Sequence, residues 1–376
     1  MAPSRKRWFL AVILIAIAAA VWFTKHDPPS AVSKTGSPPV NRTRSIVPDR
    51  EKEQAAANTT ARRRIEEDWA ELLLWLRSDP APTADEVRAR LKVLRIAWTA
   101  MDPQVLAEVL GRLLATGEDA ATGLEFRVGN HGFLSDWPAA RVFLLDVLAA
   151  SDPEMALATA RRILDQTPSA EEFATGLRSL TRQGMGRAED AELLSRFGQM
   201  LGRAEWQNSR GFAEALDLAR FVGTPDAARQ LASWNGKEAL KSMAMNEFAA
   251  EHPDAMLQIL GPDSTVDEAT RANLMARVNP EDPAQLSAVD VYLRSPDRSP
   301  EEASVFLKSF PLRSATTGYR LYGRTPSPYS YERIAAGDRK AGEMVSAWVA
   351  DPALEKYRPD LLALQQRLSK WIEQAK

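Results

Sequence analysis

Apolar side chains recur every three or four residues along most of the chain from about residue 61 onward. This spacing places them on one face of an α-helix, so it predicts a succession of amphipathic helices. Thr60 suits the N-cap of the first one. Alternation with a period of two is scarce, and only residues 304–310 suggest a strand. We therefore expect an all-α fold. The clearest stripes are Ile65, Trp69, Leu72, Leu73 and Leu76; Val87, Leu91, Leu94 and Trp98; Leu193, Leu194, Phe197, Met200 and Leu201; and Leu361, Leu364, Leu368, Trp371 and Ile372.

Asp-Pro pairs separate the predicted helices. An Asp side chain can accept hydrogen bonds from the first free N–H groups of a helix, and Pro suits the first helical position because an N–H there has no partner. Each pair is expected to end one helix and begin the next. The pairs are Asp79-Pro80, Asp102-Pro103, Asp152-Pro153, Asp282-Pro283 and Asp351-Pro352, with Thr224-Pro225 and His252-Pro253 as related pairs.

An aromatic residue and a small residue precede several of these breaks, as in segments 98–103, 248–253 and 348–352. With these flanks, residues 61–310 resemble the α-solenoids that are built from HEAT-like or TPR-like helical hairpins. The resemblance implies antiparallel hairpins that stack on one another and present a surface for binding. The spacing of the helix-starting prolines varies from 23 to 72 residues, so an irregular all-α body is the alternative.

The first 60 residues have a different character. Residues 1–7 carry three cations, residues 8–23 form an unbroken apolar run, and residues 24–60 are rich in Pro and Ser. Aromatic pairs at both ends of the run suit a transmembrane helix in the bilayer, with the cations in the cytoplasm and the body outside it. Small residues at 16–20 also fit a signal-peptide cleavage site, which would give a secreted protein. Residues 24–60 are expected to form a flexible, disordered linker.

The amino-acid composition excludes several kinds of catalytic, metal and nucleic-acid-binding site. The chain has no Cys and only three His in 376 residues. Thiol catalysis, Cys-ligated zinc and iron–sulfur clusters are therefore excluded, and we expect no cofactor and no metal. Residues 1–60 hold nine basic and four acidic side chains, so 39 basic and 46 acidic ones remain in residues 61–376. Such an acidic body lacks the positive charge that nucleic acid requires, so we expect no nucleic-acid partner.

One loop gathers side chains suited to acid–base chemistry. His131 stands between Glu125 and Asp136, with glycines nearby that permit tight bends. A histidine beside a carboxylate can act as a general acid or base, so these three residues are candidates for a hydrolytic site. The alternative is an inter-helix loop whose polar groups satisfy its own backbone.

Residues 311–376 begin with a segment rich in Tyr and Arg and are expected to end with helices that cap the array. Tyr and Arg are the side chains favoured where proteins recognise partners, because they are large and form hydrogen bonds. A glycan or peptide could dock there; alternatively, the rings cover the end of the helical array. The candidate binding residues are Arg313, Tyr319, Arg320, Tyr322, Arg324, Tyr329 and Tyr331.

These observations favour a membrane-tethered, extracytoplasmic helical scaffold that binds a protein or an envelope polymer and has no catalytic activity. A cell-envelope hydrolase with its site near His131 is one alternative. A module that binds glycans or peptides through residues 313–333 is another.

Overall fold

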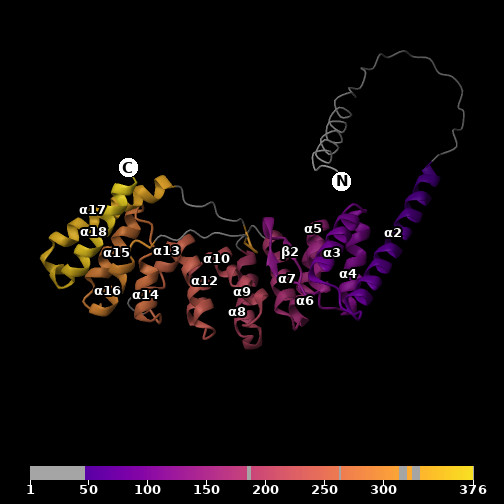
Figure 1. The fold of residues 1–376 in the computed structure, drawn as a ribbon, viewed down its shortest axis with the longest axis horizontal. Coiled ribbons are helices and arrows are strands. Elements are labelled where there is room, and N and C mark those ends of the chain that lie inside the picture. The colour runs from indigo at the N-terminus through magenta and orange to yellow at the C-terminus, as the bar shows by residue number, and fades with distance from the viewer. Residues whose placement is uncertain (1–46, 184–187, 262–263, 313–319, 324–330, 376) are drawn as a thin grey trace, which may run out of the picture. The chain divides into compact units, whose positions relative to one another are not determined.

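The computed structural model describes residues 47–183, 188–261, 264–312, 320–323 and 331–375 (Figure 1). The chain divides into two compact units, Met1–Lys52 and Glu53–Lys376. Segments 1–7 and 8–23, together with residues 24–46 of the predicted linker, lie outside the described residues. In the described part of the chain, no helix combines the length and the apolar character needed to cross a bilayer.

In the residues that the structure describes, the second unit is all-α apart from one short hairpin, and helix α2 begins before the boundary between the units. Strands β1 (Arg127–Val128) and β2 (Leu134–Asp136) pair antiparallel, on either side of the 3-10 turn η1 (Asn130–Gly132). The early helices are α2 (Val47–Leu76), α3 (Ala84–Thr99), α4 (Pro103–Thr116), α5 (Ala140–Ser151), α6 (Pro153–Gln166), α7 (Ala170–Gln183) and α8 (Ala188–Leu201). The later elements are η2 (Ala204–Trp206), α9 (Arg210–Ala215), α10 (Asp217–Val222), α11 (Pro225–Ser233), α12 (Glu238–Glu251), α13 (Pro253–Leu257), α14 (Glu268–Met275), α15 (Pro283–Arg294), α16 (Pro300–Ser309), α17 (Tyr331–Ala350), η3 (Pro352–Tyr357) and α18 (Arg358–Gln374).

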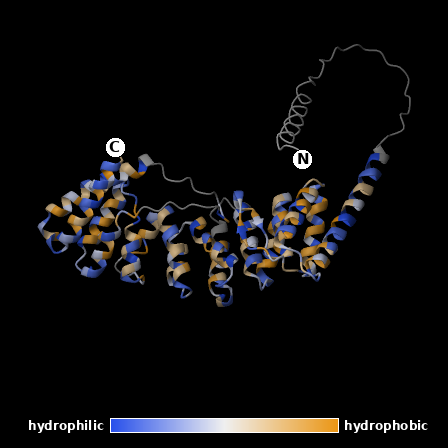
Figure 2. Cartoon of the chain, in the orientation of Figure 1, coloured by the Kyte–Doolittle hydropathy of each residue, from blue (hydrophilic) through white to orange (hydrophobic). Residues whose placement is uncertain are grey.

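Helices of the second unit pack on near neighbours in chain order. Helix α5 contacts α4, α6 and α7, and the series continues from α7 to α9, from α10 to α12, from α12 to α14 and from α14 to α16. Figure 2 shows hydrophobic and hydrophilic residues sharing the same helices, as amphipathic helices require. The buried apolar side chains form one cluster that extends from Ile65 to Leu368. The fold is therefore compatible with an array of helical repeats.

Many side-chain contacts between successive hairpins share one sequence separation. Arg141 pairs with Glu172, and Arg271 pairs with Glu302, both at 2.6 Å and both across 31 residues. The same interval separates Arg161 from Glu192, Arg220 from Glu251, Arg277 from Asn246, Gln285 from Asp254 and Ser299 from Glu268. A constant interval indicates that equivalent positions of consecutive hairpins face one another between residues 141 and 302. This 31-residue interval could not be predicted from the helix-starting prolines, because their spacing is uneven.

Most of the predicted caps are confirmed. Asp102 accepts hydrogen bonds from the backbone N–H groups of Gln104 and Val105 at the start of α4, and Pro103 occupies the first turn. Asp152, Asp282 and Thr224 cap α6, α15 and α11 in the same manner, and Asp351 caps η3. Asp79-Pro80 does not start a helix, because α3 begins at Ala84 behind a capping box formed by Thr83 and Glu86.

The predicted linker is too long at its C-terminal end. Helix α2 begins at Val47 instead of at Thr60, and the hydroxyl of Thr60 donates to the carbonyl of Ala56 inside the helix. Residues 50–57 consist only of Arg, Glu, Lys, Gln and Ala, which all favour helices. Their side chains are mostly exposed, so the sequence has no apolar stripe that would predict the first part of α2.

The strand suggested at 304–310 is also wrong. These residues belong to α16 and its C-cap, and Ala303, Phe306, Leu307 and Phe310 are buried together. Their spacing of three and four residues is helical, whereas the alternation that suggested a strand was fortuitous.

Candidate functional site

The candidate hydrolytic residues do not converge. The side chain of His131 is exposed, and its backbone is left-handed with a φ of 56°. The carboxylate of Asp136 is buried and accepts hydrogen bonds from Arg88 Nε at 2.7 Å and Nη2 at 3.2 Å. Glu125 is exposed and lies 3.6 Å from Arg127. Within the described ranges, no hydrogen bond or ion pair joins the imidazole of His131 to either carboxylate.

A buried ion pair fixes the loop between β1 and α5. Arg178 of α7 and Asp146 of α5 are fully buried, and Nη1 lies 2.6 Å from Oδ1. Arg178 also donates to the carbonyl of Gly132 at 2.8 Å. Asp146 accepts hydrogen bonds from the N–H of Leu134 at 3.1 Å and from Nε1 of Trp137 at 3.0 Å. The two charges therefore hold both ends of the segment 132–137 against the helices.

Phe133 lies among three guanidinium groups. The Cζ atoms of Arg95, Arg178 and Arg182 lie 5.4, 5.2 and 3.8 Å from the centre of its ring. Cations at these distances are attracted to the face of an aromatic ring. Burial lowers the pKa of Arg182 to about 10, and the neighbouring Arg178 adds to this effect. The aromatic ring and Asp146 together stabilise an otherwise repulsive group of cations.

Residues 320–323, which we call the strap, pack against helices that lie far earlier in the chain (Figure 1). The ring of Tyr322 is fully buried, and its hydroxyl donates to the carbonyl of Ala174 in α7 at 3.1 Å. The N–H of Tyr322 donates to Asp217 in α10 at 3.4 Å, and its carbonyl accepts from Arg220 at 3.2 Å. Burial raises the pKa of the Tyr322 phenol well above its usual value, with Asp217 adding to the effect.

The strap also covers the loop that carries His131. Gly132 has a φ of 73°, and a Cβ atom at this position would lie 2.6 Å from the carbonyl oxygen of Leu321. Only glycine satisfies both the backbone conformation and the close approach. The two segments that sequence analysis singled out separately are therefore in contact.

The structure describes the side chains of two of the predicted recognition residues, Arg320 and Tyr322. Both are buried, and both contact helices between α7 and α12 instead of the end of the array that the capping alternative predicts. Tyr331 begins α17. Arg313, Tyr319, Arg324 and Tyr329 lie outside the described residues.

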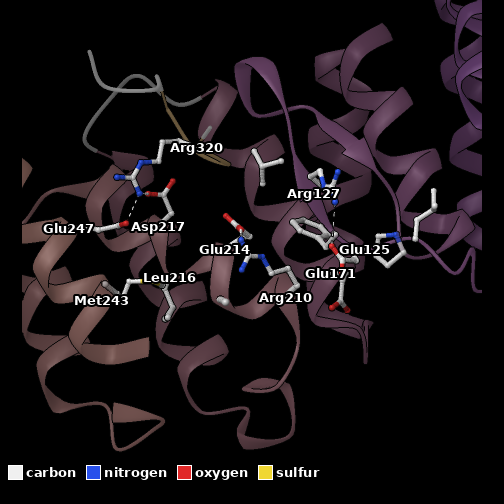
Figure 3. A pocket seen from close by; sticks show the side chains of 16 residues that line it. Glu125, Arg127, Glu171, Arg210, Glu214, Leu216, Asp217, Met243, Glu247 and Arg320 are labelled. Atoms are coloured by element: carbon white, nitrogen blue, oxygen red, sulfur yellow. Dashed lines mark hydrogen bonds and ion pairs between the residues drawn. The ribbon is translucent and has the colours of Figure 1, made fainter. Parts of the chain in front are cut away.

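A groove of about 790 Å³ opens beside the strap (Figure 3). Its walls come from residues 124–128, α7, α9, α10, α12 and the strap residue Arg320. Cavities of this size accommodate small molecules or a few residues of a peptide. Two of the predicted residues, Glu125 and Arg320, thus line one cavity, whereas His131 and Asp136 do not border it.

Charged side chains at one end of the groove form a dense network. Arg320 pairs with Glu247 and lies 3.4 Å from Asp217 and 3.7 Å from Glu251. Arg220 pairs with Asp217 and with Glu251. Three carboxylates thus surround two guanidinium groups.

The middle and far end of the groove carry three more carboxylates, which belong to Glu214, Glu171 and Glu125. Glu214 pairs with Arg210 at 2.6 Å in the middle. Glu171 accepts hydrogen bonds from the hydroxyl of Ser169 at 3.2 Å and the N–H of Gly211 at 3.4 Å. Burial raises the pKa of Glu214; Arg210 opposes this shift, and the nearby carboxylates of Asp217 and Glu247 add to it. Five carboxylates and three guanidinium groups line the groove, so the lining carries an excess of negative charge.

No group of three or more His, Cys, Asp or Glu side chains suited to a metal ion occurs among the residues that the structure describes. No protein-family model, no curated protein and no solved structure matches this chain.

The residues that build the groove were mostly missed from the sequence. Outside the groove, Asp146 carried a signal, because it is a charge inside an apolar helical run, whereas its partner Arg178 lies in a helix with many polar residues. The acidic residues of the groove carried none, since Glu171 and Glu214 are typical of exposed helix surfaces.

Proposed function

We propose that this chain is a non-catalytic binding protein that holds a segment of a partner in the groove beside the strap. The observation that carries the proposal is the groove itself, which brings together charged side chains from elements distant in sequence. Its charges are held by ion pairs, as in the contacts of Arg320 with Glu247 and of Arg210 with Glu214. Such preorganised charges suit recognition, because little side-chain entropy is lost on binding.

The architecture supports the same function. Contacts across 31 residues join consecutive hairpins, as expected of a degenerate α-solenoid of the HEAT-like or TPR-like class. Solenoids present binding surfaces built from successive repeats, and here α7, α9, α10 and α12 contribute in turn. We further propose that residues 8–23 tether the body to a membrane, outside the cytoplasm.

Photo-crosslinking from the groove tests this function. Met243 lines the groove and is 44% exposed, whereas Met155 in α6 is 39% exposed and lies outside the lining. A photoreactive amino acid replaces one or the other in the full chain, in its native membrane. We expect a discrete crosslinked partner from position 243, identified by mass spectrometry, and none from position 155.

A bulky substitution provides the control. Ala213→Trp fills part of the groove and should abolish the crosslink from position 243 without reducing the amount of folded protein. Equal crosslinking from both positions would count against the groove as the binding site. The mass of the mature chain in the same preparation shows whether residues 8–23 are retained as an anchor or removed as a signal peptide.

A further inference from the structure

We propose that the groove binds an extended peptide segment bearing two basic side chains at alternate positions. This inference rests on the proposed function and adds the chemistry of the partner. Three features of the groove lead to it: an excess of carboxylates, two residues on one wall whose backbone groups make no backbone hydrogen bond in the described part of the chain, and apolar surface between the charges.

The charges in and beside the groove do not balance. Asp217, Glu247 and Glu251 surround Arg220 and Arg320, which leaves one negative charge at this end. A peptide cation near Glu247, whose side chain is 32% exposed, would restore neutrality there.

A second negative charge lies at the other end. Glu171 receives only the neutral donors Ser169 and Gly211, and no ion pair joins it to a cation in the described parts of the chain. The Arg210–Glu214 pair, which is neutral as a whole, lies between the two ends (Figure 3). The groove thus offers two separated positions for positive charge.

One wall of the groove offers backbone groups to a peptide. Residues 124–128, which lead into and form β1, border the groove along consecutive positions. The N–H and C=O groups of Glu125 and Phe126 make no backbone hydrogen bond within the described residues. Unpaired groups along such a segment are the usual docking point for an added strand. In an extended peptide, every second side chain points the same way, so two basic residues at alternate positions face the acidic wall together.

The apolar lining suits the aliphatic part of Lys or Arg. Ala213, Leu216, Met243 and Ala244 contribute apolar surface between the acidic ends. Lysine and arginine pack their methylene groups on such surface while the charged head reaches a carboxylate.

Fluorescence anisotropy with defined peptides tests the inference. The full chain in detergent is titrated into labelled acetyl-Thr-Lys-Val-Lys-Thr-amide and into the matched peptide with both lysines replaced by glutamine. We expect the lysine peptide to bind at least tenfold more tightly, and to lose affinity on N-methylation of its central amides. Equal affinity of the lysine and glutamine peptides overturns the charge argument. Tighter binding of spermidine than of the peptide overturns the assignment of a peptide.

Two variants locate the binding. Glu171→Gln and Glu247→Gln should each weaken binding of the lysine peptide by at least threefold, and the double variant by at least tenfold. Glu154→Gln, at an exposed position of α6 outside the groove, is the matched control and should change nothing. Unchanged affinity of the double variant overturns the site, provided that its melting temperature shows a folded protein.

The two proposals fail in different ways. A partner that crosslinks to position 243 while the lysine peptide does not bind leaves the proposed function standing and refutes its basic-peptide chemistry. Absence of both results refutes both proposals.

Discussion

At the scale of single residues, the most demanding feature is the ion pair between Arg178 and Asp146. Both side chains are fully buried, so each has lost its hydration. For Asp146, hydrogen bonds replace the lost water: Arg95, Leu134 and Trp137 all donate to its carboxylate. For Arg178, fewer hydrogen bonds replace the lost water, because its Nε and Nη2 have no hydrogen-bond partner among the described residues. Its guanidinium lies against the Phe133 ring instead.

Replacing Asp146 by Asn should therefore destabilise the fold strongly. The substitution leaves Arg178 buried without a counter-charge, which costs about 3–5 kcal/mol. Urea unfolding, followed by tryptophan fluorescence, measures the loss. The matched control is Asp165→Asn, because Asp165 is 60% exposed in its pair with Arg196 and such pairs contribute about 0–1 kcal/mol. Similar losses in the two variants would show that burial does not govern the contribution of Asp146.

At the scale of elements, helices were the predictable part and their mutual register was not. Residues such as Leu91 and Trp98 made their helix predictable. They are buried on one face of it, so their apolar side chains recur at helical spacing in the sequence. The 31-residue register is carried by polar contacts between hairpins, as in Arg271 with Glu302. Sequence alone does not show which Arg faces which Glu, because most such residues lie on solvated surfaces.

The contact between α14 and α16 should make the stability of the fold depend on pH in the acidic range. Glu302 is buried, which by itself raises its pKa, but hydrogen bonds from Arg271, Arg298 and Tyr292 outweigh burial and lower the pKa to about 2. A carboxyl with a depressed pKa in the folded state stabilises the fold above its unfolded pKa near 4.5. That contribution, on the order of 3 kcal/mol, should disappear as the pH falls from about 4.5 to about 2.

Glu302→Gln should remove this part of the pH dependence. We expect the variant to be less stable than the parent at pH 7 and to show a flatter stability profile below pH 4.5, because no carboxylate remains to be protonated at this position. Guanidinium unfolding at a series of pH values tests this. Glu301→Gln, at the exposed neighbouring position, is the control and should leave the profile unchanged. An unchanged profile for Glu302→Gln would contradict the assigned pKa shift.

At the scale of the whole molecule, the strap connects regions that the helical array alone would keep apart. Helices contact near neighbours, whereas Tyr322 bonds to Ala174 across 148 residues and to Asp217 across 105. The sequence marked the strap as unusual by its Tyr and Arg content. It did not show where the strap packs, because a segment of only a few residues is too short for the spacing of its apolar side chains to indicate which helices it contacts.

Removal of the Tyr322 ring should loosen one part of the array selectively. Tyr322→Ala leaves a cavity that costs about 3–5 kcal/mol, and it releases the cover over α7, α10 and Gly132. Hydrogen exchange with mass spectrometry should show faster exchange in α7 and α10 and unchanged exchange in α17 and α18. Tyr322→Phe keeps the ring and loses one hydrogen bond, so it should change exchange only slightly. A uniform increase along all helices would mean that the strap stabilises the body without regional preference.

The late position of the strap in the chain has a consequence for biosynthesis. Helix α7 ends at Gln183 and α10 ends at Val222, which is 137 and 98 residues before Arg320 is added to the growing polypeptide. During that interval the Asp217 carboxylate and the carbonyl of Ala174 have only water in place of the strap. The central hairpins thus reach their final packing only after residues 320–323 have been synthesised and can dock on them.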